Sequence, residues 1–374
     1  MKKWFLYIAA TASLASCIYS FQPEIESSTQ KILVVDGSIL LGGESRIQLS
    51  YLSNLNQKDA VASAAGRAWI EDNAGNIYSP SSAGLTSVIK ISTENAPRGR
   101  QYRTGIEVDG NTYYSEWLEA NPAPTIENVY FDATDQNVNV YVDVNASQSV
   151  TGYLGFTFEE TWEFHSDFFP EVLVNPEDWT YNQFFKDYPY YWCFRSNLSS
   201  QRVLLDYSAL DGSRVSRYTV HSFSRKDSRN HKRYSILVKA FSLSKDAYMY
   251  NKQTQEMSEI GGDLFSPEPG TMPSNLSCEN EPSRPVMGLV LAAEVTSKRA
   301  FLKDIYRIPS APSTDILRLI SFEEMPKYYY EWNYRPVMTI TTDEGEGMGW
   351  GPHRCINCLE AGGTQEVPDF WNEE

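Results

Sequence analysis

The amino-acid sequence predicts an all-β protein with one or two short helices, organised as two domains. Short segments in which apolar and polar residues alternate recur along the chain, and turn-forming residues separate them. That two-residue period is typical of strands with one buried face, whereas helices have a period of 3.6 residues. The length of 374 residues suggests about two domains, each large enough for its own core.

Residues 1–16 have the composition of a secretory leader. Two lysines precede an apolar run over residues 4–12, which is too short to span a bilayer. Leu14 lies three residues before Cys17 with only small residues between them, which is the pattern of a bacterial lipobox. We therefore expect cleavage before Cys17 and lipidation of that cysteine, since several acyl chains together give stable membrane anchoring. The alternative is an ordinary soluble secretory leader that happens to contain a cysteine.

The polar residues 17–30 are predicted to form a tether, and residues 31–121 to form the first domain. Its strand patterns lie at 31–36, 45–52, 66–72, 76–78, 100–108 and 112–117. Turn signals separate neighbouring strands at Asn73–Gly75 and at Asp109–Asn111. Strands spaced this closely, with no helical period between them, are typical of an immunoglobulin-like β-sandwich of roughly a hundred residues.

The second domain is predicted to be a larger β-rich domain over residues 125–374, because the proline-rich segment before it is stiff and poor in hydrogen bonds. Its strand patterns lie at 138–144, 153–164, 216–223, 234–243 and 286–295. One helix is predicted near residues 244–260. Ser244 is a good N-cap, Asp246 suits the positive end of the helix dipole, and Gly261-Gly262 is a stop signal.

The formal net charge of −16 bears on the partners of the protein. An acidic surface repels nucleic acid and anionic headgroups, and the chain has no compensating basic stripe. We therefore expect no nucleic-acid partner. After the leader no apolar run is long enough to cross a membrane, so membrane attachment is predicted to depend on the lipid at Cys17 alone.

The other cysteines are Cys193, Cys278, Cys355 and Cys358. An even number in an exported chain predicts two disulfides, with three connectivities open, including a bond between the adjacent Cys355 and Cys358. Alternatively, this pair and His353 could supply three zinc ligands, with one of the other cysteines as the fourth. Because oxidising surroundings favour disulfides, we expect no metal and no cofactor. A redox-active pair is less favoured, because a glycine-rich segment precedes it in place of the usual strand.

Three glutamates, Glu159, Glu160 and Glu163, lie beside an aromatic-rich stretch. Paired carboxylates near aromatic rings are what a glycoside hydrolase uses. On a strand, Glu159 and Glu163 share one face and Glu160 lies on the other. Acid-rich chains produce such neighbours by chance, and no common catalytic motif accompanies them. We expect a protein that is not an enzyme, with an exported hydrolase using Glu159–Glu163 as the alternative.

Two runs rich in aromatic residues are candidate binding surfaces. Successive side chains of a strand face opposite ways, so a strand with consecutive rings cannot bury all of them. Exposed Tyr and Trp are typical of interfaces and ligand platforms, and burial in a core is the alternative. The candidate residues are Tyr188, Tyr190, Tyr191, Trp192, Tyr328, Tyr329, Tyr330 and Trp332.

Several short motifs together carry a family resemblance. The lipobox is followed by Leu33–Val35, Ala68–Asp72, Tyr234–Val238, Gly261–Pro269 and Ser297–Arg299. The most specific motifs are at the end of the chain, at Cys355–Cys358, Gly362–Thr364 and Pro368–Trp371. Over nearly the whole mature chain, the sequence resembles the bacterial lipoproteins catalogued as domain of unknown function 4249.

This resemblance implies a lipid-anchored protein of the bacterial outer membrane, usually encoded beside a TonB-dependent receptor. It implies no reaction and no ligand, and it leaves open whether the protein faces the periplasm or the medium. We therefore expect a non-enzymatic binding or accessory subunit of a TonB-dependent nutrient-uptake system.

Overall fold

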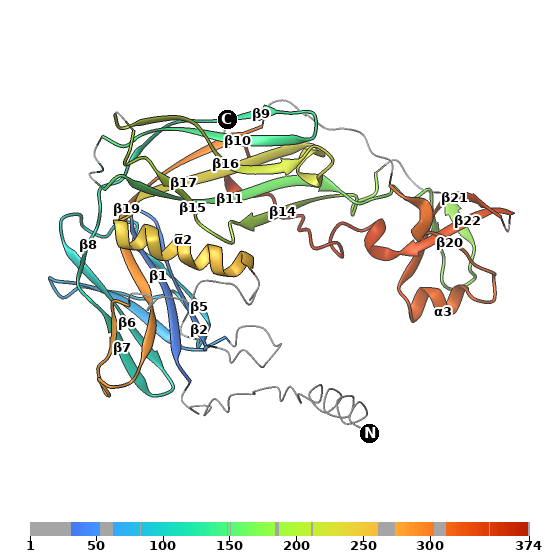
Figure 1. The fold of residues 1–374 in the computed structure, drawn as a ribbon. Helices are drawn as coiled ribbons and strands as arrows, with labels where there is room; N and C mark the ends of the chain where they lie inside the picture. Colours follow the sequence, from blue (N-terminus) through green and yellow to red (C-terminus); the bar gives the residue numbers. More distant parts are fainter. Residues whose placement is uncertain are drawn as a thin grey trace, which may run out of the picture. The chain divides into compact units, whose positions relative to one another are not determined.

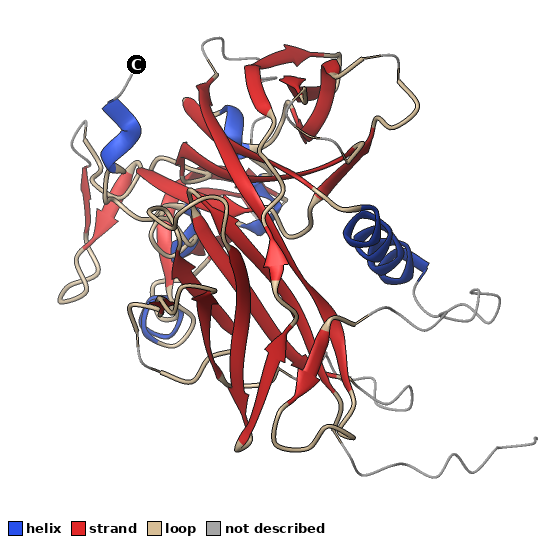
Figure 2. Cartoon of the chain, turned by 90° about the vertical axis from the view of Figure 1, so that its left-hand side faces the viewer, coloured by secondary structure: helices blue, strands red, loops and turns tan. Residues whose placement is uncertain are grey.

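The computed structural model describes residues 31–52, 63–82, 84–147, 149, 151–183, 187–210, 212–260, 274–302, 312–343 and 345–372. The predicted leader, the tether and Cys17 lie outside these residues. Strands make up most of the regular structure, which confirms the predicted all-β class (Figures 1 and 2). The described part of the chain contains two α-helices, α2 (Lys245–Ile260) and α3 (Met325–Tyr330).

One eight-stranded sheet contains strands from both predicted domains. Its path is β14 (Trp192–Leu198), β11 (Tyr153–His165), β17 (Arg233–Ser242), β19 (Val286–Phe301), β1 (Leu33–Leu41), β2 (Glu44–Tyr51) and β5 (Val88–Ser92), and β15 (Val203–Asp206) pairs with β11. The long strand β19 joins the two halves. Its first part pairs in parallel with β1, and its last part pairs antiparallel with β17.

The predicted boundary at residues 121–125 is therefore not a boundary between sheets. Leu33–Glu374 form one compact unit, in which strands from beyond residue 270 complete the N-terminal half. The physical reason is that a parallel pair needs a long crossover connection, so the partner of β1 lies far along the chain.

The predicted N-terminal sandwich forms between β1, β2, β5 and β19 on one side and a six-stranded sheet on the other. The second sheet contains β18 (Leu276–Cys278), β7 (Asn111–Ser115), β6 (Gln101–Val108), β3 (Arg67–Asp72), β4 (Ile77–Tyr78) and β8 (Leu118–Glu119). Alternate apolar residues of the two sheets, such as Val35, Ile47, Ile70 and Ile106, share one core.

A second core lies between β11, β17 and a three-stranded sheet of β9 (Thr125–Ala133), β10 (Asn137–Asn145) and β16 (Arg214–Ser224). The predicted alternation of β10 is confirmed, because Val138, Val140, Val142 and Val144 are all fully buried in that core. The predicted helix is also confirmed as α2. Ser244 caps its first turn, since the Ser244 hydroxyl accepts a hydrogen bond of 3.1 Å from the amide of Ala247. The predicted stop signal lies outside the described residues.

The remaining strands form what we call the C-terminal module. It contains α3, the pair β12 (Val172–Val174) and β13 (Tyr181–Gln183), and a small sheet of β20 (Arg318–Leu319), β22 (Gly345–Pro352) and β21 (Tyr334–Thr342). The buried Trp350 of β22 packs with Val174 of β12 and Met325 of α3. The amide of Glu171 donates to the carbonyl oxygen of Val337 over 2.8 Å, which joins the two strand groups.

Candidate functional site

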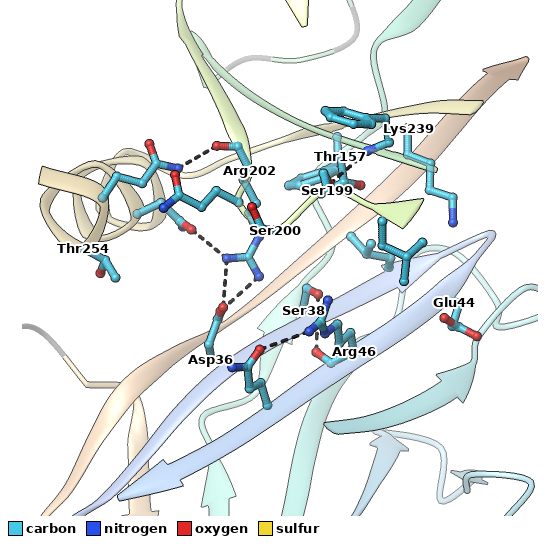
Figure 3. Close-up of a pocket in the computed structure, with 18 of the residues that line it drawn as sticks. Asp36, Ser38, Glu44, Arg46, Thr157, Ser199, Ser200, Arg202, Lys239 and Thr254 are labelled. Carbon is cyan, nitrogen blue, oxygen red and sulfur yellow. Dashed lines mark hydrogen bonds and ion pairs between the residues drawn. The ribbon is translucent and has the colours of Figure 1, made fainter. Parts of the chain in front are cut away.

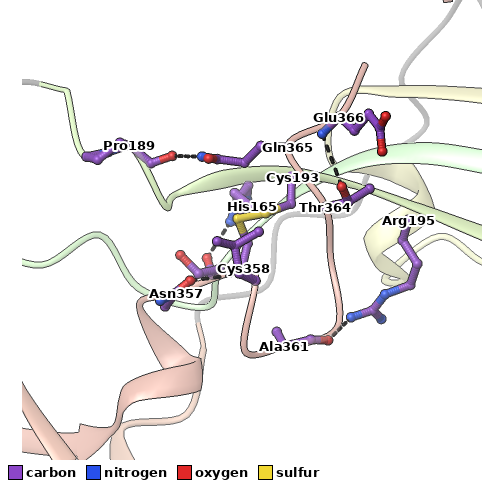
Figure 4. The surroundings of a disulfide bond; sticks show 12 residues. His165, Pro189, Cys193, Arg195, Asn357, Cys358, Ala361, Thr364, Gln365 and Glu366 are labelled. Atoms are coloured by element: carbon purple, nitrogen blue, oxygen red, sulfur yellow. Dashed lines mark hydrogen bonds between the residues drawn. A yellow bond between two sulfur atoms is a disulfide. The ribbon is translucent and has the colours of Figure 1, made fainter. Parts of the chain in front are cut away.

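A disulfide joins Cys193 of β14 to Cys358, in a turn 165 residues further along the chain (Figure 4). Both residues are buried. Beside it, Phe194 and Thr364 exchange two backbone hydrogen bonds of 2.7 and 2.8 Å. Arg195 donates to the carbonyl oxygen of Ala361. The C-terminal segment is thus fastened along β14, the edge strand of the main sheet, and covers an edge that is otherwise open to pairing.

The second predicted disulfide does not form. Cys278 is a free thiol in the sandwich core, and Cys355 is a free thiol in a core of the C-terminal module. Burial raises the pKa of the Cys355 thiol. The even cysteine count was misleading because it holds no information on which core each cysteine enters. The alternative zinc set does not assemble either, because Cys358 is oxidised and Cys278 lies in a different core.

Glu160 is the most heavily bonded of the three predicted glutamates. Arg229 donates two hydrogen bonds to its oxygens, Nη2 to Oε1 over 2.6 Å and Nε to Oε2 over 2.8 Å. Asn197 and the hydroxyl of Tyr234 donate over 3.0 Å each, and Nε2 of His221 lies 3.2 Å away. Burial alone would raise the pKa of Glu160, but the hydrogen bonds from Arg229 and the other donors hold it well below its usual range. The carboxylate is therefore ionised, and both of its oxygens accept hydrogen bonds from side chains of the protein.

The other two glutamates lie on the opposite face of β11, as predicted. Glu159 pairs with Lys239 of the neighbouring strand, and Glu163 pairs with Lys232. Their backbones are about 13 Å apart at a rise of about 3.3 Å per residue. Each carboxylate is paired with a lysine, whereas a glycosidase needs one carboxylic acid and one carboxylate facing a common substrate. The geometry thus offers three ion pairs, and nothing in it favours the hydrolase alternative.

The first aromatic run is divided between core and surface. Tyr188 is buried in the module core, and Tyr191 is half-buried against that core, where its ring stacks on His165 at 5.0 Å. Tyr190 precedes β14 and Trp192 begins it, and more than a third of each is exposed. Burial in a core therefore holds for Tyr188, and exposure at the surface holds for Tyr190 and Trp192.

The second run is helical over its first part, and not a strand. Residues 325–330 form α3, which has a proline in its first turn. Tyr328 and Tyr329 are half-buried, and the Arg335 guanidinium lies 3.7 Å from the Tyr329 ring centre. Tyr330 and Trp332 are 67% and 48% exposed. The ring of Tyr328 contacts Trp332 edge to face at 4.5 Å, so the exposed tryptophan has a fixed support.

Strained backbone accompanies these rings. Trp179 has a φ of 60°, which is costly for a residue other than glycine, and its ring meets Tyr329 and Tyr330 edge to face at 5.8 and 6.0 Å. Asn333, next to Trp332, has a φ of 54°. The sequence analysis did not select Trp179 or Tyr181 as candidate binding residues, although both belong to its aromatic-rich stretch, and it missed the exposed Phe322, which lies outside the aromatic runs.

The fold and these surfaces define an all-β protein whose C-terminal segment is linked to β14 by a disulfide and whose C-terminal module exposes aromatic side chains. No helix among the described residues is long and apolar enough to cross a membrane. The chain belongs to the family described as Domain of unknown function (DUF4249), which it matches over residues 18–299. The expected family is therefore confirmed, whereas the motifs at the end of the chain lie beyond the matched region.

None of the curated proteins matches this chain. Among solved structures it is similar to a segment of two fibronectin type-III domains from chicken tenascin, at 10% sequence identity. That similarity covers 56% of this chain and 89% of the tenascin segment, with a TM-score of 0.14. A likeness at this level carries no argument about function.

Proposed function

We propose that this protein is a lipid-anchored accessory subunit that docks onto a TonB-dependent receptor of the bacterial outer membrane. The observation that carries the proposal is the exposure of Tyr330 and Trp332 on rigid supports. Tyr and Trp dominate the binding energy of protein interfaces, and rings already held in place lose little entropy on binding. The strained backbone at Trp179 fits this role, since such strain persists where the surroundings hold a residue for function.

Membrane confinement supports the same proposal. The lipobox puts the anchor at Cys17, so the polar residues up to 30 lead from the lipid to the first strand. Confinement to a membrane surface raises the effective concentration of a partner, so even a modest interface is occupied. The receptor as partner comes from the family resemblance.

The anchor leads to a direct prediction for the variant Cys17→Ser. The natural protein should partition into detergent and carry acyl mass on its first mature residue. The variant should be released from washed membranes, because the acyl chains at Cys17 are the proposed anchor. Membrane fractionation and mass spectrometry measure both results. Retention of Cys17→Ser in membranes that lack the receptor would contradict the proposed anchor.

The docking surface leads to a second prediction, for the double variant Tyr330→Ser/Trp332→Ala. Its affinity for the receptor should fall about thirtyfold or more, because loss of two interface aromatics removes at least about 2 kcal/mol. Co-purification of the β-barrel after gentle detergent extraction, followed by titration, measures this effect. Trp117→Ala is the matched control, since Trp117 is 40% exposed but lies between β7 and β8 of the N-terminal sandwich, beside Arg103 of β6. Equal binding by the double variant and the control would rule out the module as the docking surface.

A further inference from the structure

A cleft of about 380 Å³, lined by both polar and apolar residues, lies between the outer face of β1 and β2 and the strands and helix opposite it (Figure 3). Asp36 and Ser38 of β1 and Arg46 and Gln48 of β2 form one wall, because alternate residues of these strands face away from the sandwich core. The other walls come from β11, β17, residues 198–202 and α2. The volume lies in the range of about 300–1,000 Å³ typical of small-ligand sites.

Cations and carboxylates in this cleft are nearly all paired. Arg202 lies 3.0 Å from Asp36 and donates to Asn251 over 2.7 Å. On the outer side, Lys90 lies 3.0 Å from Glu44. The Lys239–Glu159 pair described above also lines the cleft.

Arg46 is the exception among the described residues that line the cleft. Its Nη2 donates to the Gln48 side chain over 3.1 Å, and its Nε is buried without a hydrogen-bond partner. Within the described residues, it forms no ion pair with a carboxylate. A buried donor on a charged group that lacks an acceptor is unfavourable, and a guanidinium matches the two oxygens of a carboxylate. The cleft therefore has one positive charge in excess, which an anionic ligand would balance through the accessible part of the guanidinium.

Hydroxyl and amide side chains also line the cleft. They include Ser50, Thr157, Ser199, Ser200 and Thr254. Such groups can exchange hydrogen bonds with the hydroxyl groups of sugars. Three aromatic residues, Phe158, Phe241 and Tyr250, also line the cleft, and all three are buried. The net charge of −16 disfavours a polyanion, so a ligand with a single negative charge fits best.

We propose that this cleft binds a hydroxylated carboxylate of the uronic-acid class, with the Arg46 guanidinium holding the carboxylate. The serine and threonine hydroxyls that line the cleft bind the hydroxyl groups of the ligand. This site is built from β1, β2, β11, β17 and α2, so it stands independently of the proposed receptor docking through the C-terminal module.

Calorimetric titration of the purified full chain with glucuronate, galacturonate and glucose tests the proposal. At least one uronate should bind, and glucose should bind tenfold or more weakly, because it lacks the carboxylate. Arg46→Gln should weaken uronate binding tenfold or more, since a charge-assisted hydrogen bond is lost. Arg67→Gln is the matched control, because Arg67 is exposed on the other sheet and lies 4.0 Å from Glu107. The control should bind like the natural protein.

Three results would overturn the assignment. One is the absence of binding by both uronates. Another is equal uronate affinity of Arg46→Gln and the natural protein, with both folded by circular dichroism. The third is binding of glucose 6-phosphate in preference to either uronate, which would assign the site to phosphate in place of carboxylate.

Discussion

Replacing Glu160 with alanine should lower the free energy of unfolding by about 3–5 kcal/mol, the cost of removing one partner from a buried ion pair. The variant removes the two hydrogen bonds that Glu160 accepts from the Arg229 guanidinium, whose side chain is 18% exposed, and leaves Asp227 as its remaining carboxylate partner. The hydroxyl of Tyr234 also loses its acceptor inside the core. Urea denaturation at pH 7 with linear extrapolation measures the loss.

Two further variants serve as comparisons, one at Glu160 itself and one at an exposed ion pair. Glu160→Gln keeps the shape and some acceptor capacity, so its loss should be smaller than that of Glu160→Ala. Glu107→Ala breaks a pair in which both side chains are at least half exposed and should cost about 1 kcal/mol or less. Similar losses for Glu160→Ala and Glu107→Ala would show that the buried network does not stabilise the fold as described.

The same carboxylate has a defined pH dependence. Because the pKa of Glu160 is lower in the folded than in the unfolded protein, its contribution is fully present above the unfolded pKa, near 4.5. The contribution is lost as the pH falls from there toward the folded pKa. Glu160→Gln should therefore show a shallower loss of stability below about pH 4.5 than the natural protein.

Removing the disulfide should have a comparable effect on stability. The bond closes a loop of 165 residues, for which the chain-entropy relation gives about 5 kcal/mol at most. The double variant Cys193→Ser/Cys358→Ser should unfold at a markedly lower urea concentration. It should also become sensitive to proteolysis near residues 359–366, where β14 no longer holds the C-terminal segment. Cys278→Ala, at a free thiol, is the control and should retain both properties.

Thiol titration distinguishes the observed pairing from the one expected from the cysteine count. Under denaturing conditions without reductant, a protein lipidated at Cys17 as proposed should give two free thiols, from Cys278 and Cys355. A titration that gives none would mean that a second disulfide forms in the cell.

Local signals in the sequence predicted the elements that depend on local physics. The alternation at Val138–Val144 and the cap at Ser244 were sufficient to predict β10 and α2. The dual pairing of β19 was not predictable in this way, because a run such as Val286–Val295 indicates a buried strand without indicating its neighbours. The predicted domain boundary failed for that reason.

Surface features were harder to predict than core features. The two aromatic runs did mark the module, but Pro326 in the first turn of α3 was the signal for a helix, and the aromatic composition masked it. The cleft was hard to predict from the sequence, since polar residues at alternate positions such as Asp36 and Arg46 are equally typical of an ordinary solvated face of a strand. That Arg46 lacks a carboxylate partner among the described residues depends on side chains from distant strands.

The position of β19 has a consequence for the order in which the molecule can assemble. β1 is near the beginning of the chain, yet it becomes a central strand only when residues 286–294 have been made and have paired with it. Until then one side of β1 presents unpaired backbone groups, on a strand whose core-facing residues are apolar. Assembly of this sheet therefore waits until residue 294 has been made, which slows folding and leaves the unfinished polypeptide exposed to aggregation.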